Sequence, residues 1–350
     1  MVRLVALLNA AGLLAFLTAV QPAGAQDLQG PPDGQKPTMA RVPLLTDAEA
    51  WQRLPDVQQG RRDPLPVWAR ALAGSLPRTT AAMLELDWLH RAAGPLDPVL
   101  RGKIRWIVAR ANRCDYSEAY AAADLVRAGL DDNDIRALAD DGSQSSEPER
   151  SVLRFARKLT VAANTITDEE VARLVELYGD KQVVAMVLLV GYGNFQDRLL
   201  LALGCEREQG GPLPPLAVRF STRPSAGRAI APQRRPPTGA TDAGAAARIS
   251  DLQWLAMDFA ALQDQLEAQR NRRSRIRVPS WEEVRALVAP GSSGGPPVRI
   301  GWSLVCAGYQ PELAKGWSAC TRAFGEESEQ DRVFEESVFW VITRSIDCFY

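Results

Sequence analysis

Two cysteines of this chain stand where a thiol can perform redox chemistry, at the expected start of a helix. They are Cys114, in Cys114-Asp115-Tyr116, and Cys348, in Cys348-Phe349-Tyr350. The free N–H groups and the positive dipole end of a helix stabilise a thiolate, which lowers a cysteine pKa from about 8.5 towards neutrality. A second thiol one helical turn later resolves a sulfenic acid or carries a reversible disulfide. These positions therefore indicate peroxide reduction or disulfide exchange.

The two cysteine segments belong to a longer repeat, in which the second segment follows the first at a constant offset of 234 residues. Sliding the sequence by this offset, without a gap, superposes Trp68 on Trp302, Pro77 on Pro311 and Trp106 on Trp340. Matches of this kind in one register indicate an internal duplication at domain scale. The first copy continues well beyond its cysteine, whereas the second ends two residues after its own. We therefore predict that the second copy is incomplete.

Helical periodicity and capping signals run through most of the first copy. Residues 97–112 and 116–128 are expected to form two helices with a break near Cys114. Ser146 with Glu149, and Thr167 with Glu170, form capping boxes that open further helices. The second of these is expected to end at Gly179, before an apolar helix over 180–203. No stretch alternates with period two, so the predicted fold class is all-α.

The chain resembles the AhpD/carboxymuconolactone decarboxylase family. The resemblance rests on the cysteine segment, on Phe155-Ala156-Arg157-Lys158-Leu159-Thr160 and on Tyr192-Gly193-Asn194-Phe195. It covers residues of about 41 to 206 and, as a truncated second copy, about 278 to 350. Redox members of this family carry Glu, eleven residues, then Cys-x-x-Cys-x-x-x-His, and act as alkylhydroperoxidases. The resemblance implies an AhpD-like helical bundle, duplicated, with the second copy incomplete.

The first copy departs from the redox pattern of that family. Gly102 stands where the family has glutamate, Ser117 replaces the second cysteine, and no histidine follows near Tyr120. Serine cannot form a disulfide, and the pattern supplies no general base here. The first copy is therefore expected to be redox-dead, with Cys114 as a small buried residue at a helix start.

The second copy keeps the pattern as far as it extends. Glu336 stands twelve residues before Cys348, which is the family spacing, and Glu335 lies beside it. The resemblance implies that Glu336 and Cys348 are catalytic, with a hydroperoxide as substrate and a thiol or dithiol as reductant. The simpler alternative for Glu336 is a solvated charge on an apolar helix. Two further alternatives for the protein remain, a non-catalytic binding or structural protein and a lyase of the carboxymuconolactone decarboxylase type.

The composition of the chain argues against several other classes of function. The single histidine, His90, cannot supply a two-histidine metal site, and we expect no metal and no cofactor. No glycine-rich phosphate loop is present. A formal net charge of −1 gives no field that attracts nucleic acid. Because family members are typically oligomeric, a homo-oligomer remains open.

The expected organisation has six parts. Residues 1–25 have the charge, apolar run and small-residue site of a signal peptide, which predicts export to the periplasm or beyond, without stable membrane insertion after cleavage. Residues 26–40 are expected to be disordered, 41–208 to form the first AhpD-like domain, and 209–249 a Pro/Gly/Ala-rich linker. An amphipathic helix and basic connector over 250–277 then lead to the truncated second domain, 278–350.

The end of the sequence carries one further hypothesis. In the family pattern the position after Tyr350 would hold the second redox residue of the second copy. A stop codon that encodes selenocysteine would end a conceptual translation at this point, and an incomplete gene or a true truncation are the alternatives. The nucleotide sequence beyond the Tyr350 codon distinguishes these three cases.

Overall fold

A computed structural model describes residues 41–139, 145–221, 273–287 and 299–345, with positions 260, 263–264 and 267–268 between them. The predicted signal peptide, the predicted disordered segment, most of the predicted linker and amphipathic helix, and Cys348 lie outside the described residues.

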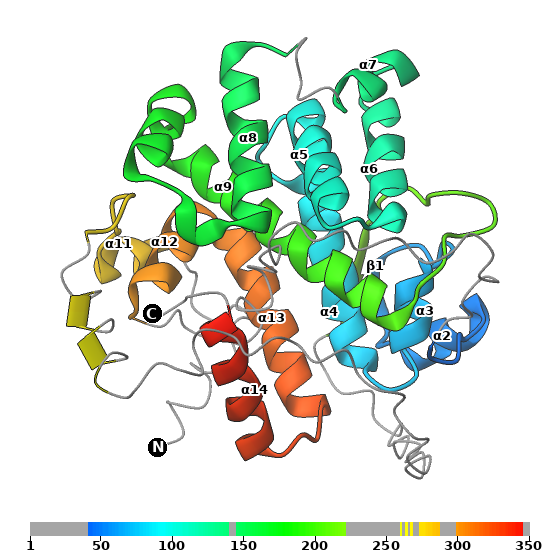
Figure 1. The fold of residues 1–350 in the computed structure, drawn as a ribbon. Helices are drawn as coiled ribbons and strands as arrows, with labels where there is room; N and C mark the ends of the chain where they lie inside the picture. The colour runs from blue at the N-terminus through cyan, green and yellow to red at the C-terminus, as the bar shows by residue number, and fades with distance from the viewer. Residues whose placement is uncertain are drawn as a thin grey trace, which may run out of the picture.

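The described chain is helical apart from two short strands, which confirms the predicted all-α class (Figure 1). In chain order the elements are α2 (Asp47–Arg53), β1 (Val57–Gly60), α3 (Val67–Leu72), α4 (Pro77–Trp88), the π-helical turn η1 (Leu89–Ala93), α5 (Pro98–Ala111), α6 (Asp115–Arg127), α7 (Asp132–Ala137), α8 (Glu147–Val161), the short 3₁₀ turn η2 (Ala163–Thr165), α9 (Asp168–Leu203), β2 (Val218–Phe220), α11 (Trp281–Leu287), α12 (Gly301–Tyr309), α13 (Pro311–Glu327) and α14 (Arg332–Ser345).

The expected helix boundaries in the first copy are confirmed to within one or two residues. Asp97 caps α5 by accepting hydrogen bonds from the N–H groups of Val99 and Leu100, at 2.9 and 3.1 Å. The Thr167 capping box at the start of α9 is complete, since Thr167 and Glu170 bond each other's backbone N–H. Sequence signals at helix ends therefore fix where the helices of the first copy begin.

Gly179 breaks α9 at the position where the sequence predicts a helix end. Its backbone has φ 76° and ψ 157°, and the helix resumes directly after it. This conformation is essentially restricted to glycine, because a Cβ atom would clash with the backbone. The break lets the N-terminal and C-terminal parts of α9 take different directions.

A two-stranded antiparallel sheet is present that the sequence does not predict. β1 pairs with β2, with Val57 opposite Phe220 and Gly60 opposite Val218. Four and three residues are too few for an alternating pattern to be recognised. Residues 209–221 fall within the predicted linker, but they pack on the first domain, because Val218 and Phe220 are buried in its core.

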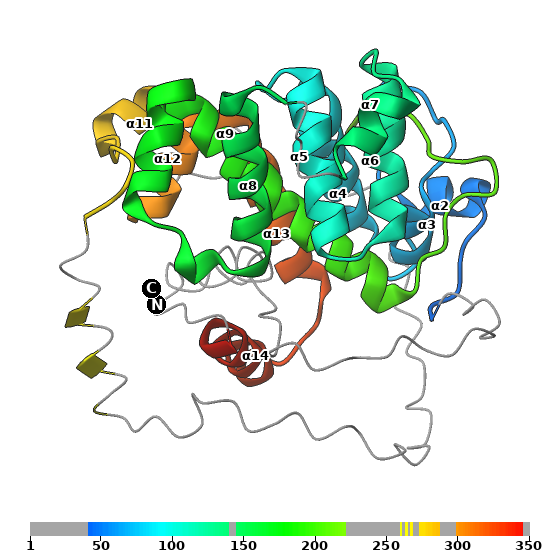
Figure 2. The same cartoon turned by 45° about the horizontal axis from the view of Figure 1, so that its top comes forward.

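Buried apolar residues form two clusters. The first joins α2, α3, α4, the C-terminal part of α9 and β2 to three residues of α13, namely Leu313, Trp317 and Cys320. The second lies between α5, α6, α8 and α9. Figure 1 shows α13 alongside α4, and Figures 1 and 2 both place α14 at the edge of the molecule.

The four C-terminal helices follow the register of the predicted repeat. Their first residues, Trp281, Gly301, Pro311 and Arg332, each lie 234 positions after the first residues of α2, α3, α4 and α5. Equal helix starts at one offset support the duplication that we propose from the sequence.

No helix among the described residues is both long enough and apolar enough to cross a membrane.

Replacing Gly179 by alanine is expected to destabilise the protein by about 1–3 kcal/mol, because alanine is strained in this backbone conformation. Chemical denaturation of both proteins measures the change in the free energy of unfolding. Gly210→Ala is the matched control, since a Cβ atom at Gly210 meets open space and its φ is ordinary. Equal stability of the Gly179 and Gly210 variants would show that the break in α9 is not required.

Candidate functional site

The predicted motif of the first copy lies at the junction of α5 and α6. Arg113 has a left-handed backbone, φ 55°, which ends α5, and Cys114 is the N-cap residue of α6. The Asn112 side chain fixes this turn to α9 by donating to Asn194 Oδ1 and Asp197 Oδ2, each at 2.8 Å. The predicted position of Cys114 at a helix start is therefore confirmed.

Burial determines the pKa, and therefore the reactivity, of the Cys114 thiol. Cys114 is 1% exposed and belongs to the first hydrophobic cluster. Its desolvation, followed by the charge of Asp197, raises the pKa of the thiol above the ordinary value. The helix start therefore does not yield a reactive thiolate at this position.

Gly102 lies in α5, and the space beside it is already filled. A Cβ atom built on Gly102 would lie 2.6 Å from Leu125 Cδ2 and 2.8 Å from Leu125 Cγ, across the contact between α5 and α6. The glutamate of the redox pattern does not fit here unless Leu125 moves. Ser117, in the first turn of α6, is buried and supplies no thiol.

A small cavity of about 50 Å³ lies between α5 and α6, next to these motif positions. It has room for a few water molecules or for one small polar group. Gly102, Ser117 and Tyr120 line it, and Cys114 does not. The cationic part of its lining consists of three arginines, Arg91, Arg101 and Arg105.

Arg91 is held firmly by carboxylates on two elements. Its guanidinium donates from Nε and Nη2 to both oxygens of Asp124, at 2.8 and 2.9 Å, and from Nη1 to Asp87 Oδ2, at 3.1 Å. Nη2 also donates to the Leu213 carbonyl, at 3.0 Å. Although burial opposes the charged form, Asp87 and Asp124 raise the pKa of Arg91. This side chain stays cationic and fixed at the cavity wall.

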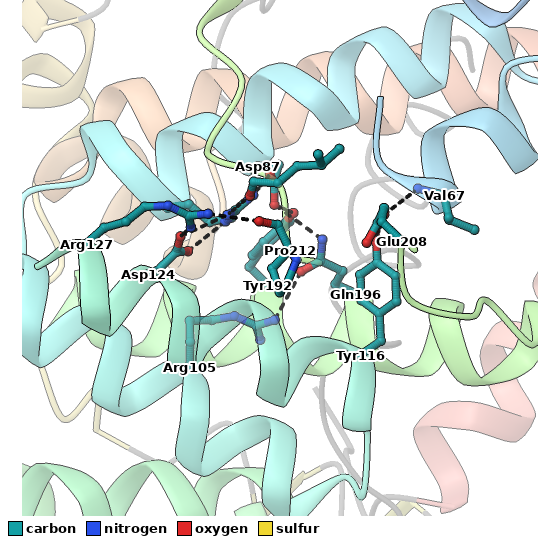
Figure 3. A network of polar contacts seen from close by, with 12 residues as sticks. Val67, Asp87, Arg105, Tyr116, Asp124, Arg127, Tyr192, Gln196, Glu208 and Pro212 are labelled. Carbon is teal, nitrogen blue, oxygen red and sulfur yellow. Dashed lines mark hydrogen bonds and ion pairs between the residues drawn. The ribbon is translucent and has the colours of Figure 1, made fainter. Parts of the chain in front are cut away.

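Arg101 and Arg105 come from one face of α5, one helical turn apart. Arg101 is 8% exposed and donates to the carbonyls of Gly94 and Leu96, and no carboxylate of the described residues forms an ion pair with it. Burial lowers the pKa of Arg101, so an anion next to it would relieve the cost of its charge. Arg105 donates from Nη2 to Gln196 at 3.0 Å (Figure 3). The same nitrogen donates, at 3.4 Å, to the buried Asp197.

Three buried polar atoms of cavity-lining residues make no hydrogen bond within the described part of the chain. They are Arg105 Nη1, Ser117 Oγ and Tyr120 Oη. Their residues are 7%, 2% and 7% exposed. Buried donors without partners are rare in folded proteins because each costs about 1–3 kcal/mol. A bound group that accepts hydrogen bonds would satisfy donors of this kind.

Gly193 of α9 provides room for one of these donors. A Cβ atom built on Gly193 would lie 2.0 Å from Arg105 Nη1 and 2.8 Å from Val108 Cγ1. The glycine is therefore required for the guanidinium to lie against α9. The close approach accounts for a glycine within this otherwise apolar stretch of α9.

A second polar group adjoins the cavity from outside the motif. Tyr116 Oη donates to Glu208 Oε1 at 2.6 Å, and the Val67 N–H donates to the same oxygen at 2.8 Å (Figure 3). The Tyr116 and Tyr120 rings stack with centroids 4.7 Å apart. Burial raises the pKa of both phenols, so both remain protonated hydrogen-bond donors.

His90 lies behind the arginines, in the buried aromatic cluster. It is 2% exposed and stacks on Tyr192, with ring centroids 4.5 Å apart. Burial, together with the charges of Arg105 and Arg101, lowers its pKa to about 3. It therefore stays neutral. No group of histidine, cysteine and carboxylate side chains that could hold a metal ion is present among the described residues.

The predicted pair of the second copy is only partly described. Glu336 lies in α14 and is half-buried, at the position that corresponds to Gly102 of α5. Cys348 lies outside the described residues, so the two are not brought together here. Glu336 does not line the cavity of the first copy.

The residues that dominate the cavity were not singled out from the sequence. Arg101 and Arg105, and Asp87 and Arg91, each stand four residues apart, on helices that are otherwise largely buried. Charges at helical spacing on a buried face are a signal of paired or ligand-binding groups. Glu208 carried no such signal, because it follows α9 in an irregular segment.

Comparison with known proteins agrees with the expected family. The family model "Carboxymuconolactone decarboxylase family" matches residues 77–157, which run from α4 to α8 and include most of the cavity wall. The chain is 22% identical over 170 residues to "Uncharacterized protein YnjA" of Escherichia coli (strain K12), an alignment that covers 48% of this chain and 90% of that protein. No solved structure matches. Residues 77–157 therefore match the family that the sequence predicts.

Introducing the family glutamate by Gly102→Glu is expected to destabilise the protein by about 1–3 kcal/mol, because the side chain must displace Leu125. The gain in helix propensity, about 1 kcal/mol, is smaller than the combined cost of overpacking and of a buried charge. Urea denaturation measures the difference. Gly74→Glu is the control at an exposed glycine. A stable Gly102 variant would show that α5 and α6 can separate to admit the redox residue.

Proposed function

We propose that the first domain binds a small carboxylate-bearing molecule in the arginine-lined cavity, without using a thiol. The observation that carries this proposal is the set of buried, unpartnered donors, Arg105 Nη1, Ser117 Oγ and Tyr120 Oη. The guanidinium nitrogen can only donate and both hydroxyls can donate, so the three together match an anionic oxygen group.

The charges of the cavity agree with an anion. Asp87, Asp124 and Asp197 are each already bonded to an arginine, and Arg101 has no carboxylate partner among the described residues. An incoming carboxylate would therefore meet a buried cation that Asp124 and Asp97 influence only from a distance, without a direct ion pair. Electrostatic attraction is strongest where water is excluded.

The bound group would be positioned for chemistry that needs no cysteine. The arginines would hold a carboxylate, and the protonated phenol of Tyr120 would donate a hydrogen bond to a second oxygen. Such fixed donors stabilise negative charge that develops during loss of carbon dioxide from an acid. This arrangement favours the lyase branch of the family, or a binding protein on the same fold, over a redox-active first domain.

Replacing Tyr120 by phenylalanine tests this function without harming the fold. Because the hydroxyl has no partner among the described residues, its loss is expected to change the free energy of unfolding by less than about 0.5 kcal/mol. Loss of a hydrogen bond to a charged ligand is expected to weaken binding by about tenfold or more. Titration calorimetry with acetate and malonate measures the affinity, and the corresponding neutral amides show whether charge is needed.

Two further variants serve as controls for this binding experiment. Tyr178→Phe removes a tyrosine hydroxyl from the second hydrophobic cluster, and Cys114→Ala removes the thiol beside the cavity. Both are expected to bind within about twofold of the wild type, since neither residue lines the cavity. Equal affinity of the Tyr120 variant and the wild type, or equal binding of amides and acids, would contradict the proposal.

A second candidate function belongs to the second copy, and the register of α14 favours it. Glu336 takes the place of Gly102, which lines the cavity in the first copy, so a second cavity would carry a carboxylate base. We propose that an exported protein of this kind would use Cys348 as a peroxide nucleophile. The thiolate sulfur would bond to one peroxide oxygen as the O–O bond breaks, and the alcohol would leave with a proton. Two equivalents of an external thiol would return the sulfenic acid to the thiol, releasing water and a disulfide.

Thiol counting tests this second function. On addition of hydrogen peroxide to the full chain, Cys348 is expected to be oxidised first, because burial raises the pKa of Cys114, Cys205, Cys306 and Cys320. Mass spectrometry after thiol labelling identifies the oxidised residue. Cys348→Ser should abolish rapid thiol loss, and Glu336→Gln should slow it by about tenfold or more. Unchanged thiol loss in both variants would rule out this function.

A further inference from the structure

α13 and α4 are equivalent helices of the two proposed copies, and they pack against each other. Pro311, the first residue of α13, lies 234 positions after Pro77, the first residue of α4. The approach is close, because a Cβ atom built on Gly316 would lie 3.0 Å from Leu86 Cδ1 and from Leu89 Cδ1. Gly316 thus allows α13 to lie directly on α4 and η1.

The C-terminal end of α13 caps the N-terminal end of α4. The two Glu327 carboxylate oxygens accept hydrogen bonds from the backbone N–H groups of Arg78 and Thr79, each at 2.7 Å. The Thr79 hydroxyl donates to the same carboxylate, also at 2.7 Å, and Arg78 forms an ion pair with Glu326. α4 has no capping side chain of its own. The second copy therefore satisfies backbone donors that α4 leaves open.

Trp317 of α13 enters the aromatic cluster behind the cavity. Its ring meets the rings of His90, Tyr192 and Phe195 edge-on, with centroids 5.9 to 6.2 Å apart. Trp317 is 5% exposed, so the ring is enclosed by the first domain. Edge-to-face packing of this kind fixes the orientation of each ring.

A short chain of contacts links Trp317 to the cavity. Tyr192 Oη donates to Asp87 Oδ1 at 2.6 Å, and Asp87 Oδ2 accepts from Arg91 Nη1 at 3.1 Å. Arg91 in turn lines the cavity and forms an ion pair with Asp124. Figure 3 shows Tyr192, Asp87 and Asp124 in this network. A shift of the Tyr192 ring would therefore move the carboxylate that orients Arg91.

We propose that Trp317 is a positioning residue for the anion site, and that the second copy acts as a built-in partner subunit that braces the first domain. This inference rests on the proposed anion-binding function of the cavity. α13 occupies on α4 the place that the same helix of a second subunit would take in a symmetric dimer. The partner is supplied within one chain, so the wall of the site is braced only when both copies are present.

The test compares anion affinity in full-length variants of the protein. Trp317→Ala is expected to weaken acetate and malonate binding by about fivefold or more, because Tyr192 loses its support. Trp317→Phe keeps an aromatic ring, and the indole N–H has no partner among the described residues, so affinity should stay within about twofold. Leu174→Ala, in the second hydrophobic cluster, is the control for a general loss of stability.

A second readout does not depend on any ligand. The Arg91 Nε–H group donates to Asp124 Oδ2 at 2.8 Å, and its hydrogen exchange reports how firmly Arg91 is held. Exchange should become faster in Trp317→Ala but not in Trp317→Phe or Leu174→Ala. If the wild type binds no anion, the proposed function is wrong. The exchange of Arg91 still tests, on its own, whether Trp317 holds the Tyr192–Asp87–Arg91 contacts in place. Unchanged Arg91 exchange in Trp317→Ala, or equal losses of affinity in Trp317→Ala and Leu174→Ala, would overturn the inference.

Discussion

The clamp on the Arg91 guanidinium is the constraint on which the rest of the structure depends. It joins η1 to α4 through Asp87, to α6 through Asp124 and to the segment before β2 through the Leu213 carbonyl. Arg127 completes the arrangement by binding Asp124 and the Pro212 carbonyl. Breaking a buried pair by removing one partner leaves a charge uncompensated, at a cost of about 3–5 kcal/mol. The same clamp holds one wall of the cavity in place, so the stability of the domain and the geometry of the site share one set of contacts.

Burial, rather than position on a helix, decides what the motif of the first copy can do. Cys114 lies at a helix start, as the sequence predicts, but desolvation raises its pKa where the helix dipole would lower it. Gly102 is packed against Leu125 and leaves no room for a glutamate. The space next to these motif positions is lined by arginines and tyrosines. The cavity between α5 and α6 is therefore cationic and holds no thiol.

Local sequence signals were enough to predict most of the helices. Most of the candidate site, by contrast, is formed by contacts between residues far apart in the sequence, which the sequence does not reveal. The capping residues Asp97 and Thr167 and the glycine at 179 act within one or two turns, so the sequence alone located these helix ends. The β1–β2 pair joins residues about 160 apart through a few residues on each side, which leaves no local pattern. Glu208 and Gln196 likewise reach the site from outside the family match, and only the packing of α9 and its following segment brings them there. The four-residue spacing of Arg101 and Arg105 can be read from the sequence. The cysteine motif, however, favoured a thiol function over an anion-binding one.

The most direct measurement of anion binding is the NMR spectrum of the arginine side chains on addition of malonate. Arg105 Nη1 has no partner among the described residues and lies at the cavity, so the Arg105 resonances should shift in a saturable way, together with those of Arg101. Arg110, which lies over the Trp106 ring and does not line the cavity, should not respond. Malonamide, which lacks the charge, should leave all three unchanged. Shifts of Arg110 equal to those of Arg105, or no saturable shift of Arg105, would contradict a carboxylate site in this cavity.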